Sequence, residues 1–269
     1  MKTLRTLSFG VAVMTMSAIS AWATSGECAL TTPKSLILTG STDAKMLACI
    51  RLKNLAAVEI VKVDSGGGSV KDALEIGDLL APLKAEFIIT KQCSSSCANF
   101  FLPIARKITL QKNAAILLHG SIDPGTAHKA IQNGMSSKVW DTVERQQNYA
   151  VKYNIHRGWL LYRDTFKNGG SKQFEYINGQ LKWKSVFGSM KVIMVEERML
   201  RSCLPNVEVT PYFDTAIDRA RLSKKKRRKL IKQGVRSSGT WACIGPGSAH
   251  LPMPDFAALR AKSNQPITK

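Results

Sequence analysis

The first 150 residues alternate short apolar runs with longer stretches in which apolar residues recur every three or four positions. The short runs are rich in β-branched residues and predict strands, whereas the longer stretches predict helices with one buried face. The predicted strands are Ser35–Gly40, Ala57–Ser65, Ala85–Thr90, Lys107–Gln111 and Ala114–Gly120. The predicted helices are Thr42–Leu55, Ser69–Lys84, Ser94–Ala105 and Thr126–Tyr153.

This order of elements predicts the fold class and the domain boundaries. Strands that alternate with helices at this spacing form right-handed crossovers, so we expect an α/β fold with a mostly parallel sheet and helices on both faces. Beyond Cys203 the chain becomes basic and rich in Pro and Gly. We therefore expect one folded domain over residues 24–205 and a basic C-terminal extension over residues 206–269.

The N-terminus has the three parts of a secretory signal. Lys2 and Arg5 precede an apolar run over Leu7–Ile19, and Ala21-Trp22-Ala23 supplies small residues for cleavage. An uncleaved membrane anchor is the alternative, but the run is short for a membrane span. We expect residues 1–23 to be a signal peptide and the mature protein to be periplasmic or secreted.

Six cysteines remain after this signal. An even number in an exported chain favours disulfides over metal ligands, and none of the spacings resembles a zinc site. Cys93 with Cys97 and Cys203 with Cys243 are the first pairs to consider, although the sequence does not fix the connectivity. We expect no bound metal.

The formal net charge is +20, and much of the excess is local. The segment Arg221–Arg236 has nine basic residues and no acid. Such a run is usually a solvated face or a disordered tail. The alternative is an anion-binding patch for an acidic envelope polymer, an anionic lipid or an acidic protein. An export signal fits poorly with nucleic acid as a partner. The residues assigned to this patch are Lys224, Lys225, Lys226, Arg227, Arg228 and Lys229.

Three features that could carry chemistry fall at the ends of predicted strands, where open α/β folds place their sites. The glycine triplet in Asp64–Val70 lets backbone N–H groups approach a ligand. Ser94–Ser96 lies between Cys93 and Cys97, and His119 closes an apolar strand. A tight turn alone would explain the glycines, and a lone histidine is more often structural. Together the three features supply a nucleophile, a base and an oxyanion pocket.

These motifs also occur in a recognisable order, VKVDSGGGSVKDALEIGDLL, then KQCSSSCANFFLPIA, then AAILLHGS. The order resembles the Clp-protease/crotonase superfamily, and in particular the exported Clp-protease-like proteins of bacteria, which carry Cys-x-Ser-x-Cys at the nucleophile turn. The resemblance covers about Leu36 to Ser121 and fades after Asn154. It implies repeated ββα units, no organic cofactor, and assembly into the trimers or rings of related folds, so a homo-oligomer is a further expectation.

The resemblance assigns an oxyanion loop to residues 65–68, where Gly66 replaces the proline of the family. The backbone N–H of Gly67, or of Gly68, would be one oxyanion donor. The N–H of Ser96 would be the second donor, because it follows the nucleophile. The family nucleophile falls on Ser95, the middle serine of the triplet.

His119 matches the base of the family, but the third member of the triad has no clear match. The family places an aspartate just before a short helix late in the domain, and the matching region Ser189–Leu204 has no acid ahead of Met194. Asp164 lies at a suitable distance downstream, although its local motif differs from that of the family.

Two hypotheses follow. In the first, the chain is an exported serine hydrolase, a peptidase that cleaves a peptide or protein through an acyl-enzyme. In the second, it is a catalytically degenerate binding or scaffold protein that engages an anionic envelope partner through its basic segment. A crotonase-type reaction on an acyl-CoA fits less well, because CoA thioesters belong to the cytoplasm.

Overall fold

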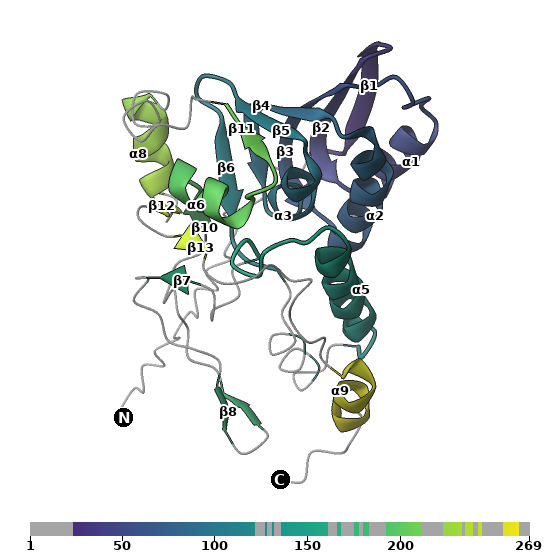
Figure 1. Cartoon of the computed structure of the whole chain (residues 1–269), viewed down its shortest axis with the longest axis vertical. Coiled ribbons are helices and arrows are strands. Elements are labelled where there is room, and N and C mark those ends of the chain that lie inside the picture. The colour runs from purple at the N-terminus through teal and green to yellow at the C-terminus, as the bar shows by residue number, and fades with distance from the viewer. Residues whose placement is uncertain are drawn as a thin grey trace, which may run out of the picture.

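A nine-stranded sheet forms the centre of the chain in this computed structural model (Figure 1). The described residues are 24–121, 127, 131, 136–160, 166–167, 175–177, 180–182, 192–210, 223–232, 235–238, 242–243 and 255–263. The predicted signal and the candidate acid Asp164 lie outside these residues.

The strands of the sheet run in the order β1, β2, β3, β4, β6, β10 and β12, with β5 and β11 attached beside β4. Strands β2 to β6 pair in parallel, whereas β1 and β10 run antiparallel to β2 and β6. The predicted α/β fold with a mostly parallel sheet is confirmed. The strands are β1 Glu27–Thr32, β2 Ser35–Thr42, β3 Ile60–Gly68, β4 Glu86–Ser94, β5 Lys107–Leu110, β6 Ala115–Leu118, β10 Val192–Met194, β11 Glu208–Val209 and β12 Val235–Ser237. Two small separate sheets pair β7 Phe166–Lys167 with β13 Ala242–Cys243, and β8 Glu175–Ile177 with β9 Gln180–Lys182.

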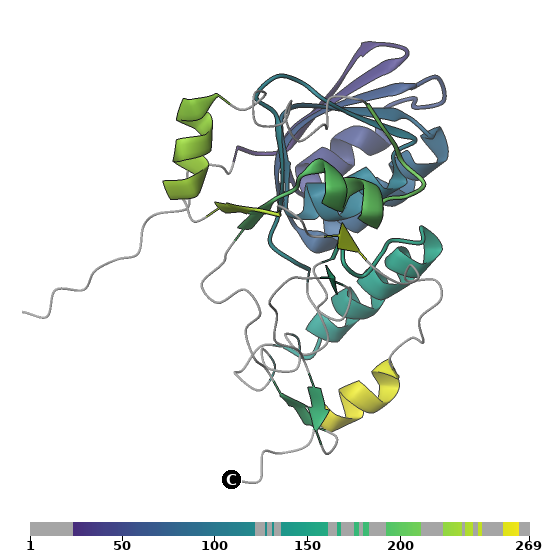
Figure 2. The same ribbon diagram turned by 60° about the vertical axis from the view of Figure 1, so that its left-hand side comes forward.

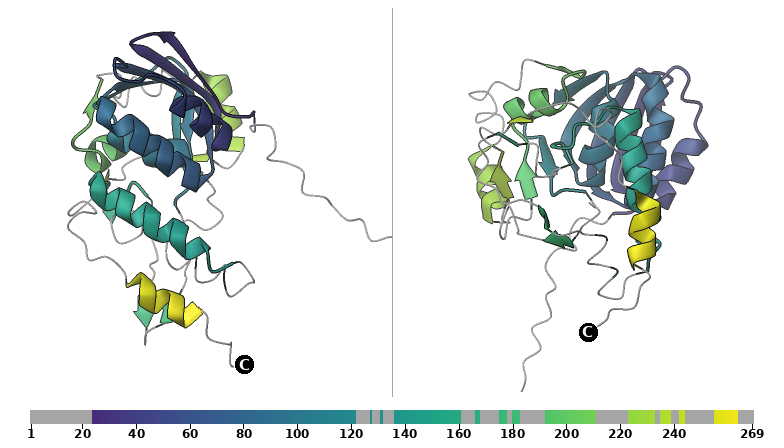
Figure 3. Two further views of the ribbon diagram at one scale, coloured as in Figure 1. Left: turned by 90° about the vertical axis from the view of Figure 1, so that its right-hand side faces the viewer. Right: turned by 60° about the horizontal axis from the view of Figure 1, so that its bottom comes forward.

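Helices α1, α2 and α3 lie on one face of this sheet, and α8 lies on the other face beside β6 and β10 (Figures 1 and 2). Successive residues of β6 face opposite sides of the sheet. Ile116 and Leu118 join the main core, while Ala115 and Leu117 pack with α8. Helix α5 lies below α2, and α9 packs against its first turn through Trp140 and Phe256 (Figure 3). The helices are α1 Ala44–Arg51, α2 Val70–Leu80, α3 Ser96–Phe101, α5 Val139–Lys152, α6 Glu197–Cys203, α8 Lys224–Lys232 and α9 Phe256–Ser263. Of these described helices, none has the length and apolar character needed to cross a bilayer.

Strand β4 changes partner halfway along its length. Its first half, Glu86–Ile89, pairs with β5, and its last residues, Gln92–Ser94, pair with Ala115–Leu117 of β6. The change of partner leaves the carboxyl ends of β3, β4 and β6 side by side. Polar residues at these three ends are therefore brought together, as open α/β sheets do at their sites.

Three disulfides join the cysteines, all of which lie in described parts of the chain. The pairs Cys93–Cys97 and Cys203–Cys243, which the sequence placed first, are confirmed. The third bond, between Cys28 and Cys49, ties β1 to α1. Strand β1 was missing from the predicted elements.

Residues beyond position 205 contribute strands to the main sheet. Strand β11 pairs with β5, and β12 pairs with β10. Leu230 and Val235 are buried against β6 and β10. The described parts of the segment 206–269 are thus folded onto the domain, and the Cys203–Cys243 bond holds them there.

Asp43 caps helix α1 and also holds the start of the described chain. One carboxylate oxygen accepts from the N–H of Met46 at 2.9 Å, and the other accepts from the N–H of Gly26 at 3.0 Å. Burial alone would raise the pKa of Asp43, but hydrogen bonds from Met46, Gly26 and Lys45 lower it overall. The charged carboxylate therefore stabilises the fold, and this contribution is lost as the pH falls through the lowered pKa.

We expect Asp43→Ala to lower the free energy of unfolding by about 1–2 kcal/mol, the usual cost of losing a helix cap. Urea denaturation near neutral pH measures this difference, which should shrink on acidification below about pH 3.9. Asp72→Ala is the matched control, because Asp72 lies in the first turn of α2 without capping it. An equal loss in both variants would contradict the role given to Asp43.

Candidate active site

Ser95 stands alone between the end of β4 and the start of α3. Its backbone angles are φ 55° and ψ −128°, a combination that L-residues rarely adopt. Such a conformation costs about 1–3 kcal/mol and persists only when the surroundings impose it. Here the Ser95 N–H donates to the carbonyl of Leu117 at 2.9 Å, and the Ser95 carbonyl accepts from the N–H of Asn99 at 2.8 Å. The sharp turn projects the serine hydroxyl away from the strand and the helix, as in a nucleophile elbow.

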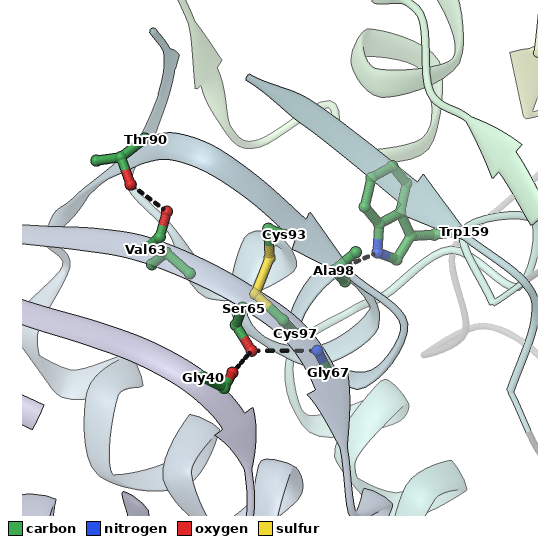
Figure 4. The surroundings of a disulfide bond; sticks show 9 residues. All are labelled: Gly40, Val63, Ser65, Gly67, Thr90, Cys93, Cys97, Ala98 and Trp159. Atoms are coloured by element: carbon green, nitrogen blue, oxygen red, sulfur yellow. Dashed lines mark hydrogen bonds between the residues drawn. A yellow bond between two sulfur atoms is a disulfide. The ribbon is translucent and has the colours of Figure 1, made fainter. Parts of the chain in front are cut away.

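A disulfide closes this turn. Cys93 is near the end of β4 and Cys97 is in the first turn of α3, with 5.4 Å between their Cα atoms. Both residues are fully buried, and Figure 4 shows the bond beside Ser65 and Gly67. The two ends of the strained turn are therefore joined covalently, and the disulfide braces it.

His119 follows the last residue of β6, the strand that pairs with the end of β4. Its Nε2 atom lies 2.5 Å from the hydroxyl oxygen of Ser95. The two side chains come from adjacent strand ends, so the spacing of the paired strands brings them within reach. Of the described residues, Ser95 is the only side-chain hydrogen-bond partner of His119.

The surroundings of His119 favour its neutral form. Desolvation lowers the pKa of the imidazole, and a hydrogen bond with its own backbone opposes this effect only in part. The residue as a whole is exposed, but its Nε2 atom lies against the hydroxyl of Ser95, and this contact leaves that atom less accessible to water. A neutral imidazole can accept the proton of Ser95 through Nε2.

The glycine triplet continues β3 instead of leaving it, so the strand ends at Gly68 and not at Ser65 as predicted. Gly67 has φ +86°, a conformation that glycine adopts without strain. The N–H of Gly67 donates to the hydroxyl of Ser65 at 3.1 Å, and that hydroxyl donates to the carbonyl of Gly40 at 2.7 Å (Figure 4). The amide assigned to the oxyanion therefore has a hydrogen-bond partner within its own loop.

The glycine loop packs directly on the nucleophile turn. A Cβ atom added to Gly67 would lie 2.5 Å from the carbonyl oxygen of Ser94, 2.6 Å from Cβ of Ser95 and 2.9 Å from the backbone nitrogen of Ser96. The Ser96 hydroxyl also donates to the carbonyl of Gly68 at 2.9 Å. Ser96 is the first residue of α3, so its N–H has no acceptor within the helix. Any side chain at position 67 would crowd this amide.

Asn99 connects helix α3 to the segment that follows His119, and the sequence did not indicate it. Its side-chain nitrogen donates to the hydroxyl of Ser121 at 2.9 Å, and Asn99 itself is buried. The signal that could have indicated Asn99 was an amide side chain within an apolar stretch, four residues after Ser95. Buried amides are almost always hydrogen-bonded, so a partner for Asn99 could have been expected.

The third member of a catalytic triad is not among the described residues. No described carboxylate contacts His119 or affects its pKa. Asp164 lies outside the described residues, and so does Ser189 at the start of the region matched to the family aspartate. In the described parts of the chain, no three His, Cys, Asp or Glu side chains form a cluster that could hold a metal ion.

The predicted anion-binding residues form a different part of the molecule. Lys224 to Lys229 lie in α8, on the opposite face of the sheet from α3. Lys226 reaches the backbone of Lys91, four residues before Ser95, but none of the cations of α8 whose side chains are described is a hydrogen-bond partner of Ser95 or His119. The basic segment and the serine site are therefore distinct.

Comparison with known proteins adds a distant likeness in fold. No family model and no curated protein matches the chain. Among solved structures, a ClpP1 point mutant from Listeria monocytogenes is similar with 14% identity and a TM-score of 0.33, over 45% of this chain and 72% of that one. An enoyl-CoA hydratase from Mycobacterium avium subsp. paratuberculosis K-10 is similar with 12% identity and a TM-score of 0.29, over 40% and 56%. Likenesses this distant carry no argument about activity, which has to come from the site itself.

Proposed function

We propose that this chain is a serine hydrolase of the peptidase type. The observation that carries the proposal is the contact between the Ser95 hydroxyl and His119 Nε2 at 2.5 Å, made by a serine in a strained strand-to-helix turn. A nucleophile within hydrogen-bond reach of a base is the arrangement that activates serine for acyl transfer. A purely structural serine would have no need of a backbone conformation that costs stability.

The proposed reaction uses groups that the site supplies. Ser95 Oγ attacks the carbonyl carbon of the substrate while its proton passes to His119 Nε2. The imidazolium then gives this proton to the leaving amine or alkoxide, and the acyl group stays on Ser95. Water then attacks the acyl-enzyme while His119 accepts its proton, and His119 returns that proton to Ser95 Oγ as the carboxylic acid leaves.

Two backbone amides are proposed to bind the oxyanion that develops in this reaction. Ser96 is the first residue of α3, and its N–H lies against the side of Gly67 where other residues carry a Cβ atom. The Gly67 N–H would exchange its partner, Ser65 Oγ, for the charged oxygen of the substrate. Hydrogen bonds to a charged acceptor are stronger than those to a neutral hydroxyl, so this exchange is favourable. Ser65 keeps its bond to Gly40 throughout.

A second function is favoured by one observation, the lack of a described carboxylate beside His119. Loss of the orienting acid lowers kcat of serine proteases about 10⁴-fold. A chain that retained the fold and this pair without efficient catalysis would act by binding a partner. Covalent reactivity of Ser95 separates the two functions.

We also propose that the chain belongs with the exported Clp-protease-like proteins and works outside the cytoplasm. Three disulfides in a chain of this length are compatible with an oxidising compartment. The signal-like residues 1–23 point the same way. Edman or mass-spectrometric analysis of the mature N-terminus after export tests this, with Thr24 as the expected first residue.

Labelling by a fluorophosphonate probe at a series of pH values tests the hydrolase. Only neutral His119 can accept the Ser95 proton, and desolvation lowers the pKa of His119. The labelling rate should therefore be full at neutral pH and fall on acidification, with a midpoint below the ordinary histidine value of about 6.5. Peptide mapping should place the label on Ser95.

Two outcomes would contradict parts of this proposal, the first the neutral surroundings of His119 and the second the hydrolase itself. A midpoint well above the ordinary histidine value would mean that an acid stabilises the imidazolium, contrary to the surroundings described above. A folded protein that is not labelled at any pH would favour the binding function.

A further inference from the structure

Helix α8 is dominated by cations, and the sequence KKKRRKLIK contains no acid. Lysines at its first three positions oppose the helix macrodipole, whose positive end lies there. Like charges three and four residues apart on a helix also repel one another. Local sequence thus disfavours this helix when it is bare, and tertiary contacts must hold it.

Those contacts come from one side of the helix. Leu230 is buried with Ala115, Leu117, Met194 and Val235 on the face of the sheet opposite the main core. This cluster fixes the C-terminal half of α8 against β6 and β10. The helix is therefore an ordered part of the fold, and not a disordered tail.

The N-terminal half of α8 is held by polar contacts. Lys226 donates through Nζ to the backbone carbonyls of Lys91 and Asn113. The N–H of Ser223, just before the helix, donates to the side chain of Asn113 at 2.8 Å. Burial lowers the pKa of Lys226, and nearby Lys229 and Lys91 lower it further while Asp64 opposes them. Lys226 thus acts as an inward anchor and faces the same side as Leu230.

The outward face carries a continuous row of cations. Lys224, Arg228 and Lys232 recur every four residues, and on a helix of 3.6 residues per turn they form one stripe opposite Leu230 and Lys226. All three are exposed, and they have no ion-pair partner in the described parts of the chain. The stripe therefore faces solvent on a helix that Leu230 and Lys226 hold against the sheet.

An apolar side chain borders this stripe. Ile231 is 63% exposed and is one of two large hydrophobic residues so exposed among the described residues, the other being Leu52. Its position on the helical wheel lies beside Lys224 and Arg228, away from Leu230. An exposed isoleucine costs solubility, and a soluble anionic polymer would not require it. The acyl boundary of a bilayer would bury it.

From this geometry we propose that the outward face of α8 docks the protein on an anionic phospholipid surface. The stripe of Lys224, Arg228 and Lys232 would meet lipid phosphates, and Ile231 would enter the headgroup region. Basic helices with apolar residues on the lipid side bind membranes in this way. The inference is independent of the hydrolase proposal, because the stripe contacts neither Ser95 nor His119.

Sedimentation with vesicles tests the proposal. The vesicles are pure phosphatidylcholine, or phosphatidylcholine mixed with an equal amount of phosphatidylglycerol. Wild type should bind only the mixed vesicles and should be released by salt. The triple variant Lys224→Gln, Arg228→Gln, Lys232→Gln should bind about a hundred-fold more weakly, as each charge near an anionic surface contributes about a factor of five. Every variant keeps the same N-terminus, so any affinity of residues 1–23 for lipid is common to all of them.

A control variant removes the same number of charges elsewhere. Lys45, Lys71 and Lys84 are exposed and lie on the α1 and α2 side of the molecule. Changing these three to Gln should leave binding within about threefold of wild type, since screening limits charges to about 8 Å. Equal losses in the two triple variants would overturn the proposal in favour of net charge alone.

Ile231→Ser separates lipid from other anions. The substitution alters an exposed residue and leaves the Leu230 cluster untouched. Vesicle binding should weaken about tenfold, because the apolar contact is lost, while binding to heparin, a soluble polyanion, should not change. Equal losses on vesicles and heparin, or no loss on vesicles, would overturn the choice of a lipid surface.

Discussion

Ser95→Ala should abolish covalent labelling by a fluorophosphonate and lower the hydrolysis of an activated ester by at least about 10³-fold. The expected loss is large because in the proposed reaction Ser95 supplies the oxygen that forms the acyl bond, and among the described residues no other serine makes a hydrogen bond to His119. The fold should persist, since alanine meets the same strained backbone as serine. Gel fluorescence, an ester assay and circular dichroism measure the three quantities.

Ser94→Ala is the matched control for this substitution. The Ser94 hydroxyl is buried and makes no hydrogen bond, so its removal should leave labelling close to that of wild type. If labelling survived in Ser95→Ala and disappeared in Ser94→Ala, the nucleophile would be assigned to the wrong residue of the triplet.

Gly67→Ala should lower the labelling rate at least about 10²-fold, the usual consequence of displacing reacting groups by about 1 Å. The added Cβ would collide with the carbonyl oxygen of Ser94 and with Cβ of Ser95, and φ +86° is strained for alanine. The turn that carries Ser95 would have to move, and the crowded N–H of Ser96 could no longer donate to the oxyanion. Labelling kinetics and urea denaturation measure the effect, with about 1–3 kcal/mol of stability lost as well.

Gly66→Ala isolates the geometric cause. The same methyl group is added one residue earlier, where φ is not positive. We expect labelling within about threefold of wild type there, because extended backbone accepts alanine readily. Equal losses at positions 66 and 67 would show that the loop tolerates no side chain at all, and would remove the special role of Gly67.

The sequence predicted the part of the fold in which local pattern and tertiary structure agree. Runs such as Ala85–Thr90 alternate buried and partly exposed positions along β4, and Ala73 and Leu80, seven residues apart, face the core from α2 as helical spacing requires. Ser95 and His119 could also be found from sequence, because each follows an apolar strand and parallel strands end at one edge.

What the sequence missed depends on contacts between distant segments. Strand β1 has no fully buried residue and only a short apolar stretch, Cys28–Leu30, and it exists because β2 offers an edge to pair with. The Asn99–Ser121 bond joins residues that have no common motif. The hydrogen bond of the Gly67 N–H to Ser65 follows from the positive φ of Gly67, which a glycine triplet permits but does not specify.

The basic segment shows how tertiary packing can override charge pattern. A run of cations such as Arg221–Arg236 is usually a solvated face or a disordered tail, yet within it one buried side chain, Leu230, and the inward Lys226 fix helix α8. A single leucine in a run of cations is a weak signal. Its partners, Leu117 and Met194, come from strands that the run itself does not indicate.

The bond between Cys203 and Cys243 encloses α8 in a covalent ring of the backbone. A protease that cut the chain once anywhere between these residues would leave a nicked protein whose two pieces stay joined. Such a product would run as an intact chain on a non-reducing gel and as two fragments after reduction. Closing a loop with a sequence separation of 40 also disfavours the unfolded chain by about 4 kcal/mol. A cleaved molecule would therefore keep helix α8 attached to the domain that carries Ser95.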